Sequence, residues 1–259
     1  IGFTALVWVI HSQLDKVLLS GILDVSKFGY YTLAVMVAGG ITSMTGPIST
    51  SLMPRLAALH TSGNYEKFKA LYLKFTAYTI VLVGTISLSL FVNAHLVLWL
   101  WTGDEIIANE SAQVLKYYSL GNLFLALSAF PYYYQYAIGD VRLHIRGTLL
   151  SFFLYVPILF VSAKLYGAVG ASFAWMSINF LYLSFWVSYS HFSLNRNIFS
   201  IWTLDLLVKS FVLPLIAVVL IGQFEFNSLS KLQSIVYIAS TSLIIILSFF
   251  PLIRKFKLI

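Results

Sequence analysis

The chain has 259 residues, of which 59% are hydrophobic, 17% aromatic and only 10% charged, and its formal net charge is +7. Soluble domains carry about 25% charged residues, so this composition excludes an ordinary soluble protein. The sequence contains no cysteine, which excludes disulfides, thiolate metal sites and cysteine nucleophiles. Lys and Arg in cytoplasmic loops explain the basic balance, and no basic stripe indicates nucleic-acid binding.

Long uncharged stretches predict membrane-spanning helices. No Asp, Glu, Lys or Arg occurs between Lys74 and Asp104, or between Lys164 and Arg196. A helical crossing of a bilayer needs about 20 predominantly apolar residues. We therefore expect an all-α, polytopic transmembrane helix bundle with about eight spans. In chain order the predicted spans are residues 2–22, 29–53, 73–93, 113–138, 147–165, 169–190, 203–222 and 232–252.

The segments between the spans are short. Most of the 16 Lys and Arg residues fall on one side of this arrangement, which places that side in the cytoplasm. Residues 55–72 mix apolar and polar groups and predict an amphipathic helix on the cytoplasmic surface. Gly167 and Gly170 predict a tight turn between the fifth and sixth spans. The chain begins at Ile1 inside an apolar segment, so we expect it to be the C-terminal part of a longer protein.

Asp15 is the first candidate site residue, because a charged group in a spanning helix costs about 3 kcal/mol on insertion scales. His11 lies four residues earlier on the same helical face, and Gln13 and Lys16 are nearby. In one interpretation these groups face a water-filled cavity and bind a proton, a cation or sugar hydroxyls. In the other, Asp15 and Lys16 form a pair near the outer interface. Lys116, in the fourth span, is a further cavity candidate.

A run of aromatic residues closes the fourth span. Tyr132, Tyr133 and Gln135 suit the stacking and hydrogen bonding of sugar rings. Tyrosine is also the ordinary residue where helices meet lipid headgroups, and both interpretations stay open. Tyr118, at the other end of this span, is typical of such an interfacial belt.

Basic residues follow this aromatic run. Arg142 and Arg146 are candidates for binding a diphosphate through bidentate contacts, although topology alone also demands basic residues there. Asp205 and Lys209, four residues apart, predict an ion pair. Four prolines interrupt predicted spans and are candidate hinges: Pro47, Pro131, Pro157 and Pro214.

No motif for catalysis or cofactor binding occurs. The sequence contains no Walker A loop, HExxH or GxSxG motif, and no cluster of His and carboxylates at metal-ligand spacing. We therefore expect no enzyme activity, no catalytic residue, no metal and no cofactor.

Two stretches resemble a known family. Residues 13–21 (QLDKVLLSG), followed by Phe28-Gly29-Tyr30-Tyr31, match the first helix and the start of the second helix of that family, and residues 47–57 (PISTSLMPRLA) match the end of its second helix. The sequence resembles the polysaccharide or O-antigen flippases (Wzx-type) of the multidrug/oligosaccharidyl-lipid/polysaccharide exporter superfamily. The resemblance implies that residues 1–190 form the second six-helix lobe of a two-lobed exporter and that residues 191–259 form an appended helix pair.

This resemblance implies a transporter of the bacterial inner membrane. It would flip an undecaprenyl-diphosphate-linked oligosaccharide by alternating access, with Asp15 at the family's acidic position. The implied partners are that substrate, membrane lipids, a missing N-terminal lobe and other polysaccharide assembly proteins. Two alternatives stay open, an ion-coupled drug exporter of the same fold and a membrane-embedded O-antigen polymerase or glycosyltransferase. The latter usually needs a long outer loop, which is missing here.

Overall fold

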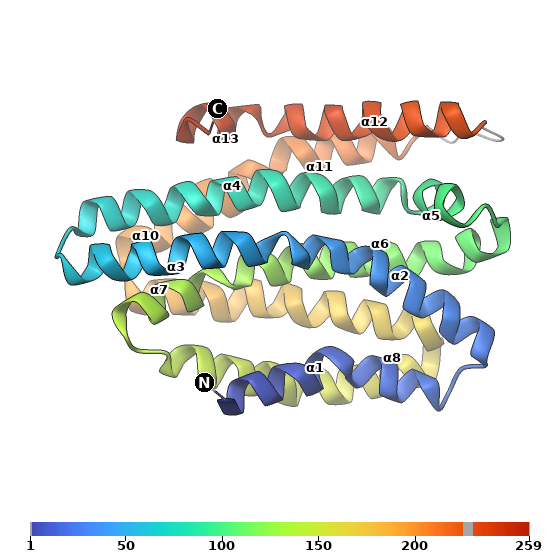
Figure 1. Ribbon diagram of the computed structural model, residues 1–259, viewed down its shortest axis with the longest axis horizontal. Helices are drawn as coiled ribbons and strands as arrows, with labels where there is room; N and C mark the ends of the chain where they lie inside the picture. The colour runs from blue at the N-terminus through green and yellow to red at the C-terminus, as the bar shows by residue number, and fades with distance from the viewer. Residues whose placement is uncertain (1, 225–229, 259) are drawn as a thin grey trace.

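The computed structural model describes residues 2–224 and 230–258, and every regular element in these ranges is a helix (Figure 1). The elements are α1 (Gly2–Ser20), α2 (Val25–Ser43), α3 (Thr45–Thr61), α4 (Tyr65–Val92), α5 (Ala94–Thr102), α6 (Glu105–Ser128), α7 (Phe130–Ile138), α8 (Arg142–Leu181), the π-helix η1 (Tyr182–Val187), α9 (Ser188–Leu194), α10 (Arg196–Ser200), the π-helix η2 (Ile201–Val208), α11 (Lys209–Ile221), α12 (Lys231–Ser248) and α13 (Phe250–Phe256). The long helices run side by side along the longest dimension of the molecule. In Figure 1, α1 and α8 lie at one flank, and α11 and α12 lie at the other.

The described helices confirm a multi-pass membrane bundle. Five helical stretches within the described residues are long and apolar enough to cross a bilayer. They are Val25–Thr61, Tyr65–Val92, Arg142–Leu194, Arg196–Ile221 and Lys231–Ser248. The fifth and sixth predicted spans both lie within the stretch Arg142–Leu194. The helices α1 and α6, which carry more polar residues, are not among the five.

The predicted turn between the fifth and sixth spans is confirmed. Gly167 has φ 57° and ψ −133°, a conformation that breaks the helical path inside α8. A Cβ atom added at Gly170 would lie only 1.9 Å from the carbonyl oxygen of Ser162. The first glycine supplies the positive φ and the second permits the close approach of the backbone.

The expected amphipathic surface helix over residues 55–72 is wrong. Instead α3 continues to Thr61, a turn follows, and α4 begins at Tyr65. Gly63 takes the left-handed conformation with φ 70°, and the side chain of Asn64 accepts a hydrogen bond of 3.3 Å from the backbone N–H of Lys67. A left-handed glycine followed by an N-cap ends one helix and starts the next.

Two of the candidate hinge prolines follow breaks in the helices. Pro47 lies in the first turn of α3, directly after α2 ends, and Pro131 lies at the start of α7, directly after α6 ends. Proline is favoured in the first turn of a helix because its missing N–H has no partner there. Pro157 and Pro214 lie inside α8 and α11, which continue through them.

The C-terminal helices pack against the flank formed by α4. The Asn93 amide donates to the Thr241 hydroxyl oxygen over 3.0 Å, and the Tyr78 hydroxyl donates to the backbone carbonyl of Leu258 over 2.8 Å. The predicted pair of Asp205 and Lys209 is confirmed, with 2.7 Å between Lys209 Nζ and Asp205 Oδ1. The bonds of Asn93 and Tyr78 join α12 and Leu258 to α4 at two levels along its length.

Candidate functional site

Three helices converge on the carboxylate of Asp15. The Asp15 side chain is buried in α1, and its Oδ2 atom accepts hydrogen bonds from the hydroxyls of Tyr31 on α2 and Tyr118 on α6. The two hydroxyl oxygens are 2.8 Å apart. In the described part of the chain, the other carboxylate oxygen of Asp15 is buried and has no hydrogen-bond partner. The site therefore holds one free acceptor beside a pair of hydroxyl groups.

Aromatic rings from α8 form a wall of this site. The buried His11 ring lies 4.6 Å from the ring of Tyr155 and 5.6 Å from the ring of Trp175. The Trp175 ring stacks on Tyr118 at 5.8 Å. The Tyr155 hydroxyl is buried and, among the described residues, has no hydrogen-bond partner. His11 and Asp15 thus lie in one buried cluster, as their spacing of four residues predicts.

This arrangement suits a small charged species. A carboxylate with a free oxygen, held in place by two phenol hydroxyls, can take up a proton or a monovalent cation. Keeping an ionisable group in the membrane region is costly and marks it as a functional candidate. Within the described residues, no group of three or more His, Cys, Asp or Glu side chains is placed to hold a metal ion.

Asn122 connects the wall to α2. Its amide donates to the backbone carbonyl of Ala38 over 2.8 Å, and its carbonyl oxygen accepts from the Trp175 indole N–H over 3.0 Å. The neighbouring Gly121 makes room for this contact, since a Cβ atom there would lie 2.6 Å from the Trp175 ring. Asn122 therefore fixes α2, α6 and α8 relative to one another.

Gln13 and Lys16 do not join the Asp15 cluster. Gln13 is exposed, Lys16 is partly exposed, and the Lys16 ammonium donates to the Gln13 side-chain carbonyl over 2.8 Å. The alternative in which Asp15 pairs with Lys16 is therefore wrong, because a helical turn places the two side chains on different faces. Lys116 is partly buried on α6, two residues before Tyr118 and so on another side of that helix.

The aromatic run on α7 joins this helix to α8. Tyr133 is buried, and the Tyr132 ring lies 4.5 Å from the ring of His144. The buried Gln135 accepts a hydrogen bond of 2.8 Å from the backbone N–H of His144 through its side-chain oxygen. Two of the three candidates for binding sugar, Tyr132 and Gln135, thus contact His144 at the start of α8.

Arg142 and Arg146 are exposed on the first turns of α8. The Arg142 guanidinium donates bidentate hydrogen bonds to the Asp140 carboxylate, with distances of 2.9 Å from Nε to Oδ1 and 2.6 Å from Nη2 to Oδ2. This hydrogen bonding lowers the pKa of Asp140 to about 2. The loop lies at the end of the bundle where α1 begins (Figure 1), whereas Asp15 lies in the last third of α1. The two groups of candidates are therefore separate.

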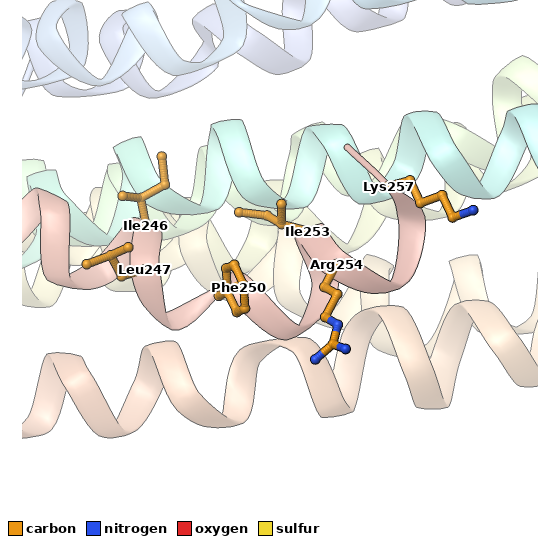
Figure 2. Close-up of a pocket in the computed structure, with 6 residues that line it drawn as sticks. All are labelled: Ile246, Leu247, Phe250, Ile253, Arg254 and Lys257. Atoms are coloured by element: carbon orange, nitrogen blue, oxygen red, sulfur yellow. The ribbon is translucent and has the colours of Figure 1, made fainter. Parts of the chain in front are cut away.

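A groove of about 780 Å³ lies on α12 and α13 (Figure 2). Ile246, Leu247, Phe250 and Ile253 form its apolar part, and Arg254 and Lys257 lie toward one end. This lining suits contact with acyl chains of the bilayer and does not include any candidate that the sequence indicates.

Several residues of the Asp15 site escape prediction from the sequence. Tyr118 is buried against Asp15, so its interpretation as an interfacial belt residue is wrong. Tyr155, Trp175 and Asn122 lie in apolar spans where aromatic residues are common. A signal is present only for Asn122, since an amide in the middle of the predicted span 113–138 needs a hydrogen-bond partner.

Comparison with known proteins places this geometry in a family. The family model MatE matches residues 1–161. The chain belongs to the MatE family. This MatE chain is also similar in fold to a solved structure described as "Lipid II flippase MurJ, inward closed conformation", with a TM-score of 0.76 and 14% sequence identity. The match covers 98% of the MatE chain and 52% of that structure, so the MatE chain spans about half the length of its structural relative.

No curated protein matches the sequence of this MatE chain. The family match and the shared fold support the expected place in the exporter superfamily and a role as a membrane transporter.

Proposed function

We propose that this chain forms one lobe of a flippase for a lipid-linked glycan. The substrate is an undecaprenyl-diphosphate-linked oligosaccharide, such as an O-antigen or another surface-polysaccharide repeat unit, and the membrane is the bacterial inner membrane. Residues 1–190 form the lobe and residues 191–259 the appended pair. A second lobe completes the cavity, and other polysaccharide assembly proteins supply and consume the substrate.

The exposed face of α1 is the observation that carries this proposal. Gln13, which is exposed, and Lys16, which is partly exposed, are hydrogen-bonded to each other on the outer surface of the described helix bundle. An exposed cation in contact with acyl chains is costly. In this proposal an aqueous cavity between two lobes provides the polar surroundings of this face.

The charge of the surface that α1, α2 and α3 would present to the proposed cavity favours an anionic, hydroxyl-rich substrate. The helices α2 and α3 contain no Asp or Glu, and their exposed side chains include Ser43 and Thr50. Asp15, the acidic residue of α1, is buried and does not lie on this cavity-facing surface. A neutral to basic cavity surface suits a diphosphate and sugar hydroxyls and disfavours a cationic drug. A relative described as a lipid II flippase gives further support for a lipid-linked substrate.

In this proposal Asp15 couples transport to an ion. One elementary charge crossing 100 mV contributes about 2.3 kcal/mol, which is enough to bias an alternating-access equilibrium. Arg142 and Arg146 attract the diphosphate at the cytoplasmic mouth, and Lys16 receives it inside the cavity.

Substitutions in cells test this function. Lys16→Gln and Asp15→Asn are expected to trap lipid-linked repeat units on the cytoplasmic leaflet at normal protein abundance. Lys27→Gln is the matched control, because Lys27 is an exposed lysine in the first turn of α2 and pairs with Asp24. Normal surface glycan in both site variants contradicts the proposal. Exported but unjoined repeats would favour a polymerase, and loss of dye resistance would favour a drug exporter.

A further inference from the structure

The groove on α12 and α13 has an apolar part and a basic end (Figure 2). Its volume of about 780 Å³ lies within the range of about 300–1,000 Å³ for sites that bind small molecules. The spacing of its lining residues places them on one face of two consecutive helices. Along the chain this face carries apolar side chains first and basic side chains last: Ile246, Leu247, Phe250, Ile253, Arg254 and Lys257.

The junction between α12 and α13 holds the groove in place. The helix α12 ends at Ser248, and the buried Phe249 packs on α4, where a Cβ atom added at Gly84 would lie 2.9 Å from the Phe249 ring. Pro251 lies in the first turn of α13, where its missing N–H needs no partner. The groove residues lie on both sides of this junction, so the contact of Phe249 with Gly84 fixes both halves of the groove against the bundle.

The backbone of Lys257 is also constrained. Its φ of 48° is the one positive value at a non-glycine residue within the described ranges, and such a conformation is unfavourable for a residue with a Cβ atom. The turn directs the next residue, Leu258, into the protein, where Leu258 is buried and its carbonyl accepts a hydrogen bond of 2.8 Å from Tyr78. The Lys257 side chain is therefore held at the end of the groove.

The basic end of the groove carries charge that the protein does not neutralise. Arg254 and Lys257 are exposed, and among the described residues their side chains have no hydrogen-bond or ion-pair partner. The neighbouring Lys255 differs, because its ammonium lies 2.8 Å from Asp205 Oδ2. The other oxygen of Asp205 binds Lys209 at 2.7 Å. This carboxylate is therefore already shared by two lysines, and Arg254 and Lys257 stay available to an external anion.

The dimensions of the groove match one leaflet of a bilayer. At about 1.5 Å per residue, the path from Ile246 to Lys257 is about 16 Å long, and half of a hydrocarbon core is about 15 Å. The helix α12 is one of the apolar stretches long enough to cross a bilayer. Leu247 and Phe250 are each 58% exposed, and the basic end lies on the side expected to be cytoplasmic. The groove therefore has the length and the polarity of a phospholipid in the cytoplasmic leaflet.

We propose that this groove binds one anionic phospholipid of the cytoplasmic leaflet. Arg254 and Lys257 donate hydrogen bonds to the phosphate oxygens, and an acyl chain lies against Leu247 and Phe250. A phospholipid with a cationic head group binds more weakly, because the two basic side chains repel its ammonium. The bound lipid holds α13 at the membrane surface. This inference needs only a chain that lies in a bilayer and does not rest on the proposed transport function.

Lipid retention by the purified chain tests the basic end. Phosphatidylglycerol and phosphatidylcholine with the same acyl chains are titrated separately, and native mass spectrometry counts the lipids that stay bound. We expect one phosphatidylglycerol to be retained in preference to phosphatidylcholine. Arg254→Gln or Lys257→Gln should weaken its binding roughly fivefold, and the double variant roughly 25-fold. Lys255→Gln is the matched control, because it removes the same formal charge from α13 without touching the groove.

A second pair of variants tests the apolar part. Leu247→Trp fills the groove and is expected to reduce phosphatidylglycerol binding several-fold. Leu243→Trp is its control, since Leu243 lies one turn earlier on α12, is 57% exposed and does not line the groove. All altered side chains are exposed, and thermal unfolding without added lipid verifies that each variant is folded. Added phosphatidylglycerol should raise the Tm of the native chain and of both controls, but not of Leu247→Trp or the double variant.

Three results overturn the proposal. The first is equal retention of the two phospholipids, and the second is an equal loss of binding in Lys255→Gln and in the groove variants, which would indicate attraction to the basic surface as a whole. The third is retention of undecaprenyl phosphate in preference to phosphatidylglycerol, which would assign the groove to the tail of a transported lipid. A failure of glycan flipping leaves this binding unaffected, so the two proposals fail separately.

Discussion

Gly121 gives the sharpest test of how the Asp15 site is packed. A Cβ atom added there would lie 2.6 Å from Trp175 Cδ1 and 3.2 Å from the Met176 Cα, well inside ordinary contact distance. Gly121→Ala therefore forces Trp175 and the backbone of α8 away from α6. Overpacking of this kind costs about 1–3 kcal/mol, while alanine in a helix gains about 0.5–1 kcal/mol. The net loss of stability is about 0–2.5 kcal/mol, centred near 1 kcal/mol.

Gly40→Ala is the matched control for this substitution. Gly40 also lies in a helix, but an added Cβ would meet nothing within 4 Å. We expect this variant to be more stable than the native chain by about 0.5–1 kcal/mol. Thermal unfolding in detergent, followed by tryptophan fluorescence, measures both, and 1 kcal/mol corresponds to about 2–4 °C in Tm for a chain of this size.

The order of the three melting temperatures tests this reasoning. Gly121→Ala should melt below the native chain and Gly40→Ala above it. Transport should fall in Gly121→Ala as well, because Trp175 positions Tyr118 and Asn122. A Gly121→Ala protein as stable and active as the native chain would refute the close packing of α6 on α8.

Further predictions concern the ends of the helices. Asp205→Asn removes the ion pair with Lys255 at 2.8 Å and is expected to speed tryptic cleavage near the C-terminus, with a stability loss below about 1 kcal/mol. Asn64→Ala removes the cap of α4 and should cost about 1 kcal/mol in thermal unfolding. Arg142 lowers the pKa of Asp140 from 3.8 to about 2, so the pair stabilises the fold above about pH 4 and this contribution disappears as the pH falls toward 2. The difference in Tm between the native chain and Asp140→Asn, followed from pH 6 to 2, should shrink accordingly; a constant difference would contradict this assignment.

The sequence predicts the helices better than their ends. A long uncharged stretch must be helical in a bilayer, which is why the spans are recovered. The end of α3 is missed because the apolar residues of 55–72 outweigh the short turn at Gly63, although a Ser-Gly-Asn sequence is a turn signal. The turn at Gly167 is found because two glycines between two long apolar runs are typical of a break between helices.

The candidate site is only half predicted, for a different reason. His11 and Asp15 share a face at a spacing fixed by the helix, so their proximity follows from local geometry. Tyr31 and Tyr118 reach the same carboxylate from other helices, and no local pattern distinguishes a tyrosine that bonds a buried Asp15 from one that faces headgroups. Gln135 likewise accepts its hydrogen bond at the start of α8 only because the fold brings α7 and α8 together, which no local pattern predicts.

The bonds from α4 to the C-terminal helices make the bundle mechanically unequal. Thr241 and Leu258 bond to that flank at two levels, whereas the hydroxyl groups of residues 42–45, beyond the bond between Asn122 and Ala38, donate to carbonyls of their own segment. A change in bilayer thickness or lateral tension acts on both flanks with similar force. We therefore expect the segment around Met44 to deform before the flank at α4, which would make the lipid composition of the membrane an input to the rate at which this protein changes shape.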